Sequence, residues 1–161
     1  MRHLLGLAIT LLCSLAMADE ERPALVILDI VPHGASEVEA TAIGNGLIRG
    51  ARELEAFQVF SSEDARQFLA IERQKQLLGV SDEASLGMLQ SGLGARHVIA
   101  GSITKTTSYQ LEVRLLDTTS AKVISQAALG PIERFADLPA QVPALAQQLL
   151  GHLLAEESGH A

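Results

Sequence analysis

The sequence is poor in aromatic side chains and in basic residues, and these shortages exclude two classes of partner. It contains no Trp and a single Tyr, Tyr109, so nucleic-acid bases would find few rings to stack on. Lys and Arg number 12 against 19 Asp and Glu, which gives a formal net charge of −7. The basic residues are also scattered singly, so no positive stripe forms to attract phosphates. We therefore expect neither nucleic acid nor an anionic membrane surface as a partner.

The only cysteine, Cys13, lies in a segment that is typical of a secretory signal peptide. A short basic start is followed by an apolar run, and then by the small-residue cleavage pattern Ala16–Ala18. We predict a signal peptide over residues 1–18, a single periplasmic domain over 19–155 and a loose tail over 156–161, with no integral membrane span after cleavage.

A lipid anchor on Cys13 is not expected. A lipoprotein signal needs small residues directly before its cysteine, and this chain has Leu11 and Leu12 there. After cleavage no cysteine remains, which excludes a disulfide, a thiolate nucleophile and a cysteine-ligated zinc site.

Catalytic and cofactor-binding patterns are missing as well. The stretch 92–105 has glycines, hydroxyls and a lysine, but its glycines follow a predicted helix and precede a strand, the reverse of a phosphate-binding loop. No histidine has a second histidine at three- or four-residue spacing, and no carboxylate at that spacing indicates a metal site. No serine lies in a Gly-x-Ser-x-Gly turn. We expect no enzyme, no cofactor and no metal.

The hydrophobic patterns predict an α/β (α+β) domain in the order β-α-β-α-α-β-β-β-α. A mixed sheet of about five strands with helices packed on its faces satisfies this order. The predicted strands are 24–31, 57–61, 97–104, 109–117 and 122–129, the last ended by Pro131. The predicted helices are 36–55, one from Ser61 or Ser62 to Gly79, 82–93, and a last one over 138–153.

Several local features refine this prediction. Ser36 and Glu39 form a capping box for the first helix. Its glycines suggest close packing of that helix on the sheet, and Gly101 suggests a close approach to a strand. Asp29, the single charge in an apolar strand, is expected to be buried and hydrogen-bonded.

Three residues are candidates for a binding surface. Glu112 and Arg114 alternate with Leu111, Val113 and Leu115, so they should lie on the solvent-exposed face of the middle strand, where they either contact a partner or are only solvated. His33 follows the first strand, at a position where α/β proteins often carry functional groups.

The segments 93–103 and 109–124 carry a resemblance to a known group of domains. The sequence LGARHVIAGSI followed by YQLEVRLLDTTSAKVI resembles the periplasmic domain of CsgG-type curli-secretion lipoproteins, lipoprotein activators of penicillin-binding proteins, flagellar-associated envelope proteins and the amino-terminal domain of TolB. The resemblance spans roughly residues 24–129. It implies an α/β sandwich without catalysis that binds other envelope proteins; pore formation is not carried over.

Two functions remain as hypotheses. The first is a periplasmic protein-binding or accessory module of a cell-envelope assembly (a secretion, peptidoglycan-synthesis or Tol-like system), with addition of a β-strand to a free sheet edge as one route of binding. The alternative is a small-ligand receptor domain that uses a crevice near His33 and Gly34.

Overall fold

The computed structural model describes residues 22–73, 87 and 90–158. Its elements are β1 (Ala24–Ile27), β2 (Val31–His33), α1 (Glu37–Glu53), β3 (Gln58–Ser61), α2 (Ser62–Arg73), β4 (Ala95–Lys105), β5 (Tyr109–Asp117), β6 (Lys122–Ile132), the short 3-10 helix η1 (Phe135–Asp137) and α4 (Val142–Ser158). The predicted α/β class and element order are confirmed. The predicted helix 82–93 and the end of the preceding helix at Gly79 lie mostly outside the described residues.

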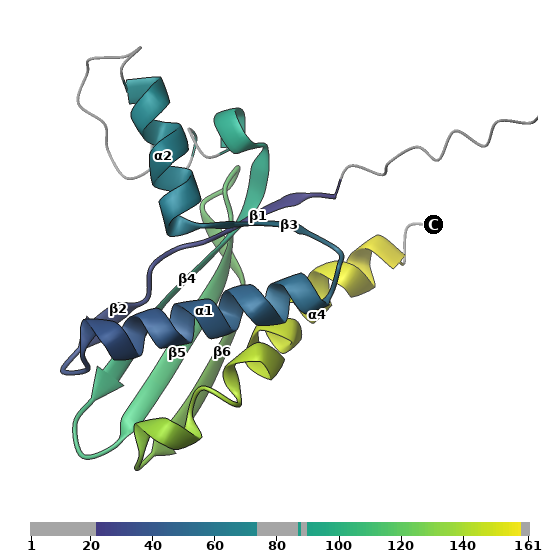
Figure 1. The fold of residues 1–161 in the computed structure, drawn as a ribbon. Coiled ribbons are helices and arrows are strands. Elements are labelled where there is room, and N and C mark those ends of the chain that lie inside the picture. The colour runs from purple at the N-terminus through teal and green to yellow at the C-terminus, as the bar shows by residue number, and fades with distance from the viewer. Residues whose placement is uncertain (1–21, 74–86, 88–89, 159–161) are drawn as a thin grey trace, which may run out of the picture.

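The six strands form one mixed sheet in the order β3-β1-β4-β5-β6, with β2 also paired to β4 (Figure 1). Strands β3, β1, β2 and β4 run parallel, whereas β4, β5 and β6 form an antiparallel meander. Short polar links of a few residues join the strands of the meander, as the sequence predicted. The sheet therefore has a parallel half and an antiparallel half that share β4.

Helices α1 and α4 lie across one face of the whole sheet (Figure 1). The main core fills the space between these helices and the sheet. The alternation in β5 buries Leu111, Val113 and Leu115 against these helices. Helix α2 covers the opposite face only at the parallel half, where Ala65 packs on Val26 and Val98. This difference in covering decides which surface is left for a partner.

Two of the three glycines of α1, Gly46 and Gly50, meet another helix rather than the sheet, and Gly44 meets nothing within 4 Å. A Cβ on Gly50 would lie 2.6 Å from Cα of Pro143, and one on Gly46 would lie 2.9 Å from Cγ1 of Val142. The expected packing of these glycines on the sheet is therefore wrong, because α4 crosses α1 at this point. Gly101 does allow a close approach, since a Cβ there would lie 2.8 Å from Cγ1 of Val113.

The first strand is interrupted where the sequence predicted a continuous run. Residues 28–30 leave the ladder between β1 and β2, although both strands pair in parallel with β4. Only β1 is buried on both faces; Val31 in β2 is 51% exposed. Asp29 lies in the interruption and its side chain is 66% exposed, so the expected burial of this carboxylate is wrong.

Two predicted ends also shift. Strand β6 continues through Pro131 to Ile132, because the ladder changes register between its pairs at Leu129 and Ile132 and requires no N–H from the proline. At the carboxyl end α4 begins at Val142, so Leu138 and Pro139 precede it, and the helix runs past residue 155 to Ser158. None of the described helices is long and apolar enough to cross a membrane.

Candidate functional site

Strands β2, β4, β5 and β6 share one face, opposite α1 and α4, that no described helix covers, and we call it the open face. The ladder registers place its side chains in three rows across β2, β4, β5 and β6: Ala100, Arg114 and Gln126; Val31, Ser102, Glu112 and Ala128; His33, Thr104 and Gln110. Neighbouring strands lie about 4.8 Å apart, so the middle row spans about 14 Å. The open face is therefore wide enough to contact another protein.

The structure brings the three predicted binding residues onto this one face. Glu112 and Arg114 are both exposed on β5 and are separated by one buried residue. Their alternation with buried leucines and valine predicted this exposure. His33 is exposed on β2, opposite Thr104, which in turn faces Gln110. Two strand spacings separate His33 from β5, so the three side chains share a surface without forming a compact cluster.

A shallow hollow of about 340 Å³ lies on the open face between β5 and β6. Residues 112–114 and 126–128 line it, so Glu112 and Arg114 form one side and Gln126 and Ala128 the other. The hollow combines one charge of each sign with a neutral amide and small apolar groups. Such a mixture suits contact with a protein surface, where Arg is enriched and ion pairs help to set orientation.

A second hollow, of about 440 Å³, lies at the carboxyl ends of β1 and β3, the edge where open α/β sheets bind ligands. Its apolar side is formed by Ile27, Ile30, Ala40 and Ile48. Its polar side carries three carboxylates and one guanidinium. A crevice therefore exists at the strand ends, but its lining does not include His33 or Gly34.

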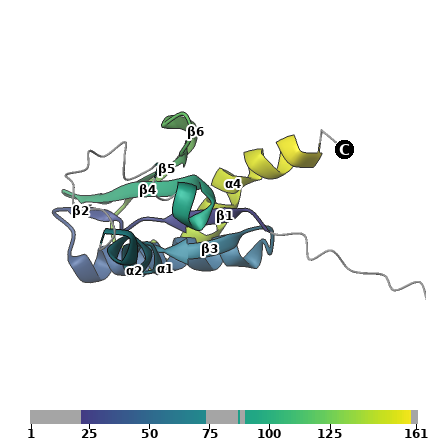
Figure 2. The same cartoon turned by 90° about the horizontal axis from the view of Figure 1, so that it is seen from above.

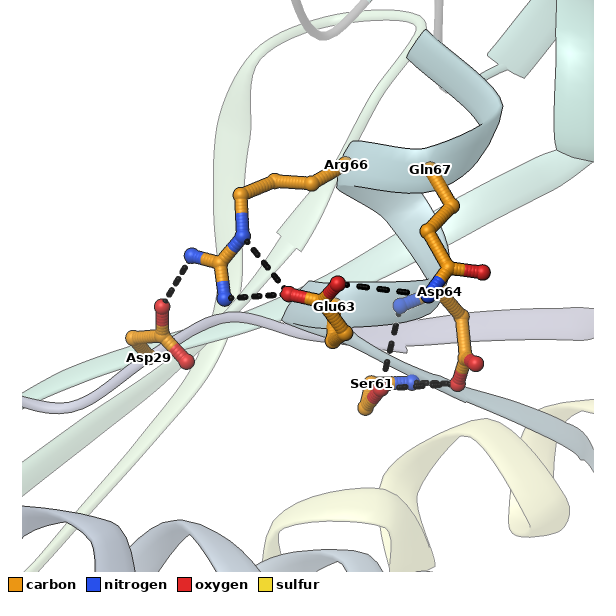
Figure 3. Close-up of polar contacts among 6 residues, drawn as sticks. All are labelled: Asp29, Ser61, Glu63, Asp64, Arg66 and Gln67. Carbon is orange, nitrogen blue, oxygen red and sulfur yellow. Dashed lines mark hydrogen bonds and ion pairs between the residues drawn. The ribbon is translucent and has the colours of Figure 1, made fainter. Parts of the chain in front are cut away.

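Arg66 organises the polar side of this second hollow (Figure 3). Its guanidinium donates to Oδ2 of Asp29 at 2.6 Å and to Oε2 of Glu63 at 3.1 Å. These hydrogen bonds, with the one to Asp29 contributing most, raise the pKa of Arg66. The Arg66 and Asp29 side chains are more than half exposed, so their ion pair adds little stability and leaves both groups accessible to a ligand.

The start of α2 is capped beside this cluster (Figure 3). Ser61 accepts from the backbone N–H of Asp64 at 3.2 Å, and Oδ2 of Asp64 accepts from the backbone N–H of Ser61 at 2.8 Å. The backbone hydrogen bond from Ser61 is the main reason why the pKa of Asp64 is lowered. Of the two serines proposed as the cap, Ser61 is therefore the one that serves.

Sequence reasoning missed Arg66. Its pairing with Glu63 follows from helical spacing, but its contact with Asp29 joins residues 37 positions apart. That contact depends on the parallel pairing of β1 with β3, which carries α2 beside the end of β1. Within residues 22–73, 87 and 90–158, no group of three or more His, Cys, Asp or Glu side chains is placed to hold a metal ion.

Comparison with known proteins gives structural but no sequence relatives. No protein-family model matches the chain, and no curated protein is significantly similar to it in sequence. Among solved structures, the PelC dodecamer from Paraburkholderia phytofirmans aligns with a TM-score of 0.50 at 13% identity, over 81% of this chain and 86% of that one. The LpoB C-terminal domain from Escherichia coli aligns with a TM-score of 0.50 at 16% identity, over 72% of this chain and 89% of that one.

TolB from Acinetobacter baumannii aligns less well, with a TM-score of 0.45 at 15% identity, over 80% of this chain but 28% of that one. At these identities the similarities show the fold alone, and the TolB score is too low to support an argument. The expected resemblance to envelope lipoproteins is supported at the level of the fold. The expected resemblance to CsgG-type proteins stays a prediction. The chain has a fold that is also found in envelope lipoproteins.

Proposed function

We propose that this chain is a non-catalytic accessory module of a bacterial cell-envelope assembly, and that it binds another envelope protein in the periplasm. The observation that carries the proposal is the open face, on which Glu112 and Arg114 stand beside a shallow hollow. Fold similarity to an envelope lipoprotein domain and the predicted signal peptide agree with it.

The character of the open face favours a protein over a small molecule. Its hollow is shallow and lies on the flat surface of two strands, whereas sites for small molecules enclose most of the ligand. Exposed aliphatic side chains lie at the margins of the open face. Val31 ends the middle row on β2, and Val123 lies on β6 opposite Leu116 of β5. Apolar groups around a pair of opposite charges resemble the composition of protein–protein interfaces.

Strand addition is a second way in which this module can hold a partner. The sheet ends in β3 on one side and in β6 on the other, and β6 has 11 residues. A strand added beside β6 would extend the open face and place its own side chains next to Gln126 and Ala128. In this arrangement the backbone of β6 provides affinity, and the open face provides specificity.

The experiment is an affinity capture of periplasmic partners after mild crosslinking, with variants of matched charge. Arg114→Glu reverses a charge on the open face, and Arg49→Glu makes the same change at an exposed position on α1. We expect one envelope protein to be enriched by the parent chain and by Arg49→Glu, and to be lost with Arg114→Glu. Equal recovery by all three chains, or no enrichment above background, would contradict the proposal.

A small-ligand receptor domain is the second candidate function. Its binding site would be the second hollow, at the ends of β1 and β3, instead of the expected crevice near His33 and Gly34. The observation in its favour is that Arg66, Asp29 and Glu63 converge on an apolar recess. A thermal-shift screen of periplasmic metabolites tests it, with Arg66→Ala as the site variant and Arg134→Ala as an exposed control. A ligand that stabilises the parent and the control but not Arg66→Ala would support this candidate; no shift with any compound would remove it.

A further inference from the structure

Strand β6 offers a long free edge of 11 residues whose single charged residue, Lys122, is its first. It pairs with β5 on one side, and none of the described strands pairs with its other side. Figure 2 shows it at the margin of the sheet, on the far side of β5 from β4. Its row of outward backbone groups is a template for another strand.

Natural proteins usually protect such an edge with charged side chains, proline or bulges, and in β6 Lys122, Pro131 and the two changes of register all lie toward the ends of the strand. The middle of the edge, residues 125–129, has none of them. From Val123 to Ile132 the sequence VISQAALGPI has no Asp, Glu, Lys or Arg. Two exposed aliphatic residues, Val123 at 48% and Ile124 at 38%, lie near its beginning. An edge of this kind tends to be covered in the working form of the protein.

The charges at the two ends of β6 indicate what covers it. Lys122 begins the strand and Glu133 follows its last residue, and neither has an ion-pair partner among the described residues. When a strand pairs antiparallel with a copy of itself, the beginning of each copy meets the end of the other. Self-pairing therefore brings Lys122 of each copy close to Glu133 of the other, at both ends of the same interface.

The faces of the strand agree with this pairing. With Ala127 opposite its own copy, Ser125 faces Leu129 and Gln126 faces Ala128, so core-side residues meet core-side residues and open-face residues meet open-face residues. Lys122 then faces Ile132, one residue from Glu133. The middle of β6, residues 125–129, is paired in this way, and the open faces of the two copies form one continuous surface.

We propose that a second copy of this chain occupies the free edge, giving a two-fold symmetric dimer through antiparallel β6–β6 pairing. The inference rests on the strand-addition part of the proposed function and deepens it by naming the occupant. Glu112 and Arg114 stay exposed in the dimer, because they lie on the face of the sheet and not at its edge. A partner that binds the open face meets two copies of it.

Charge exchange at the ends of β6 tests the pairing directly. The chain is purified from the periplasm and its mass in solution is measured by analytical ultracentrifugation over a range of concentrations. We expect a monomer–dimer equilibrium. Lys122→Glu leaves only acidic ends and Glu133→Lys only basic ends, so each variant alone should dimerise about tenfold more weakly. A 1:1 mixture should form a heterodimer, and the double variant should recover the parent homodimer.

The centre of the interface has its own variant. Gln126→Lys places two lysines near the two-fold axis and should weaken the dimer, whereas Gln110→Lys makes the same change on the open face of β5, away from the edge, and should not. Circular dichroism checks that each variant folds. A monomer at all concentrations, or a dimer that none of the end-charge and Gln126 changes affects, would overturn the inference. Because no partner is present in this experiment, its failure leaves the capture experiment on the open face unaffected.

Discussion

The hydroxyl of Tyr109 donates a hydrogen bond of 2.7 Å to Oε1 of Glu39, which links the start of β5 to the first turn of α1 across 70 positions of sequence. The same carboxylate accepts from the backbone N–H of Ser36 at 2.8 Å, so one side chain both caps the helix and fixes it to the sheet. The ring of Tyr109 is buried and touches Phe135, with 5.6 Å between the ring centroids.

Removal of the Tyr109 hydroxyl should therefore destabilise the fold. Tyr109→Phe keeps the ring contact with Phe135 and removes only the donor to Glu39. We expect the free energy of unfolding to fall by about 1 kcal/mol, the usual net value of a hydrogen bond. Urea denaturation measures it, and an unchanged midpoint would show that this link contributes nothing to the stability of the fold.

Acid should weaken the same corner of the molecule. Hydrogen bonds from the Ser36 backbone and then from Tyr109 lower the pKa of Glu39 below its usual 4.5. A carboxyl whose pKa is depressed by folding contributes stability that is present above its unfolded pKa and is lost as the pH falls through its folded pKa. We expect Glu39→Gln to lose stability relative to the parent at neutral pH, and the difference to shrink below about pH 4.5. A difference that stays constant from pH 7 to pH 3 would contradict this.

Two alanine substitutions in α1, one at its contact with α4 and one away from it, should change the stability of the fold in opposite directions. Gly50→Ala forces a Cβ against Pro143, and we expect a loss of about 1–3 kcal/mol from overpacking. Gly44→Ala in the same helix meets nothing within 4 Å and should gain up to about 1 kcal/mol from helix propensity. Thermal denaturation of the two variants checks both signs, and equal effects would refute the assigned contact.

The ion pair between Arg66 and Asp29 should matter little for folding. Both side chains are largely exposed, so a double-mutant cycle of Arg66→Ala and Asp29→Ala should give a coupling free energy close to zero. Chemical denaturation supplies the four values. A large coupling free energy would mean that the cluster holds α2 to β1 and serves the fold rather than a ligand.

The features that the sequence predicted well are those whose signal is local. The capping box joins residues three positions apart, and the alternation in β5 is visible within nine residues; both are confirmed. The exposure of Glu112 and Arg114 follows from that alternation alone. The meander could be predicted because its three strands are joined by short links.

The features that were missed depend on which elements become neighbours. Asp29 is exposed because the chain leaves the ladder between β1 and β2, and its partner Arg66 arrives on a helix that follows another strand. Pro131 does not end β6, because the ladder changes register at that point. Gly46 and Gly50 of α1 face α4, which follows them by about a hundred residues. None of these relationships has a periodic signal in the sequence.

Site-specific photocrosslinking in the periplasm tests whether the open face binds a partner. A photoreactive residue replaces Gln110 on the open face or, as the matched control, Gln148 on the exposed side of α4. We expect a discrete crosslinked envelope protein from position 110 that is missing from position 148. Crosslinks from position 148 alone, or none from position 110, would contradict the claim that this face binds a partner.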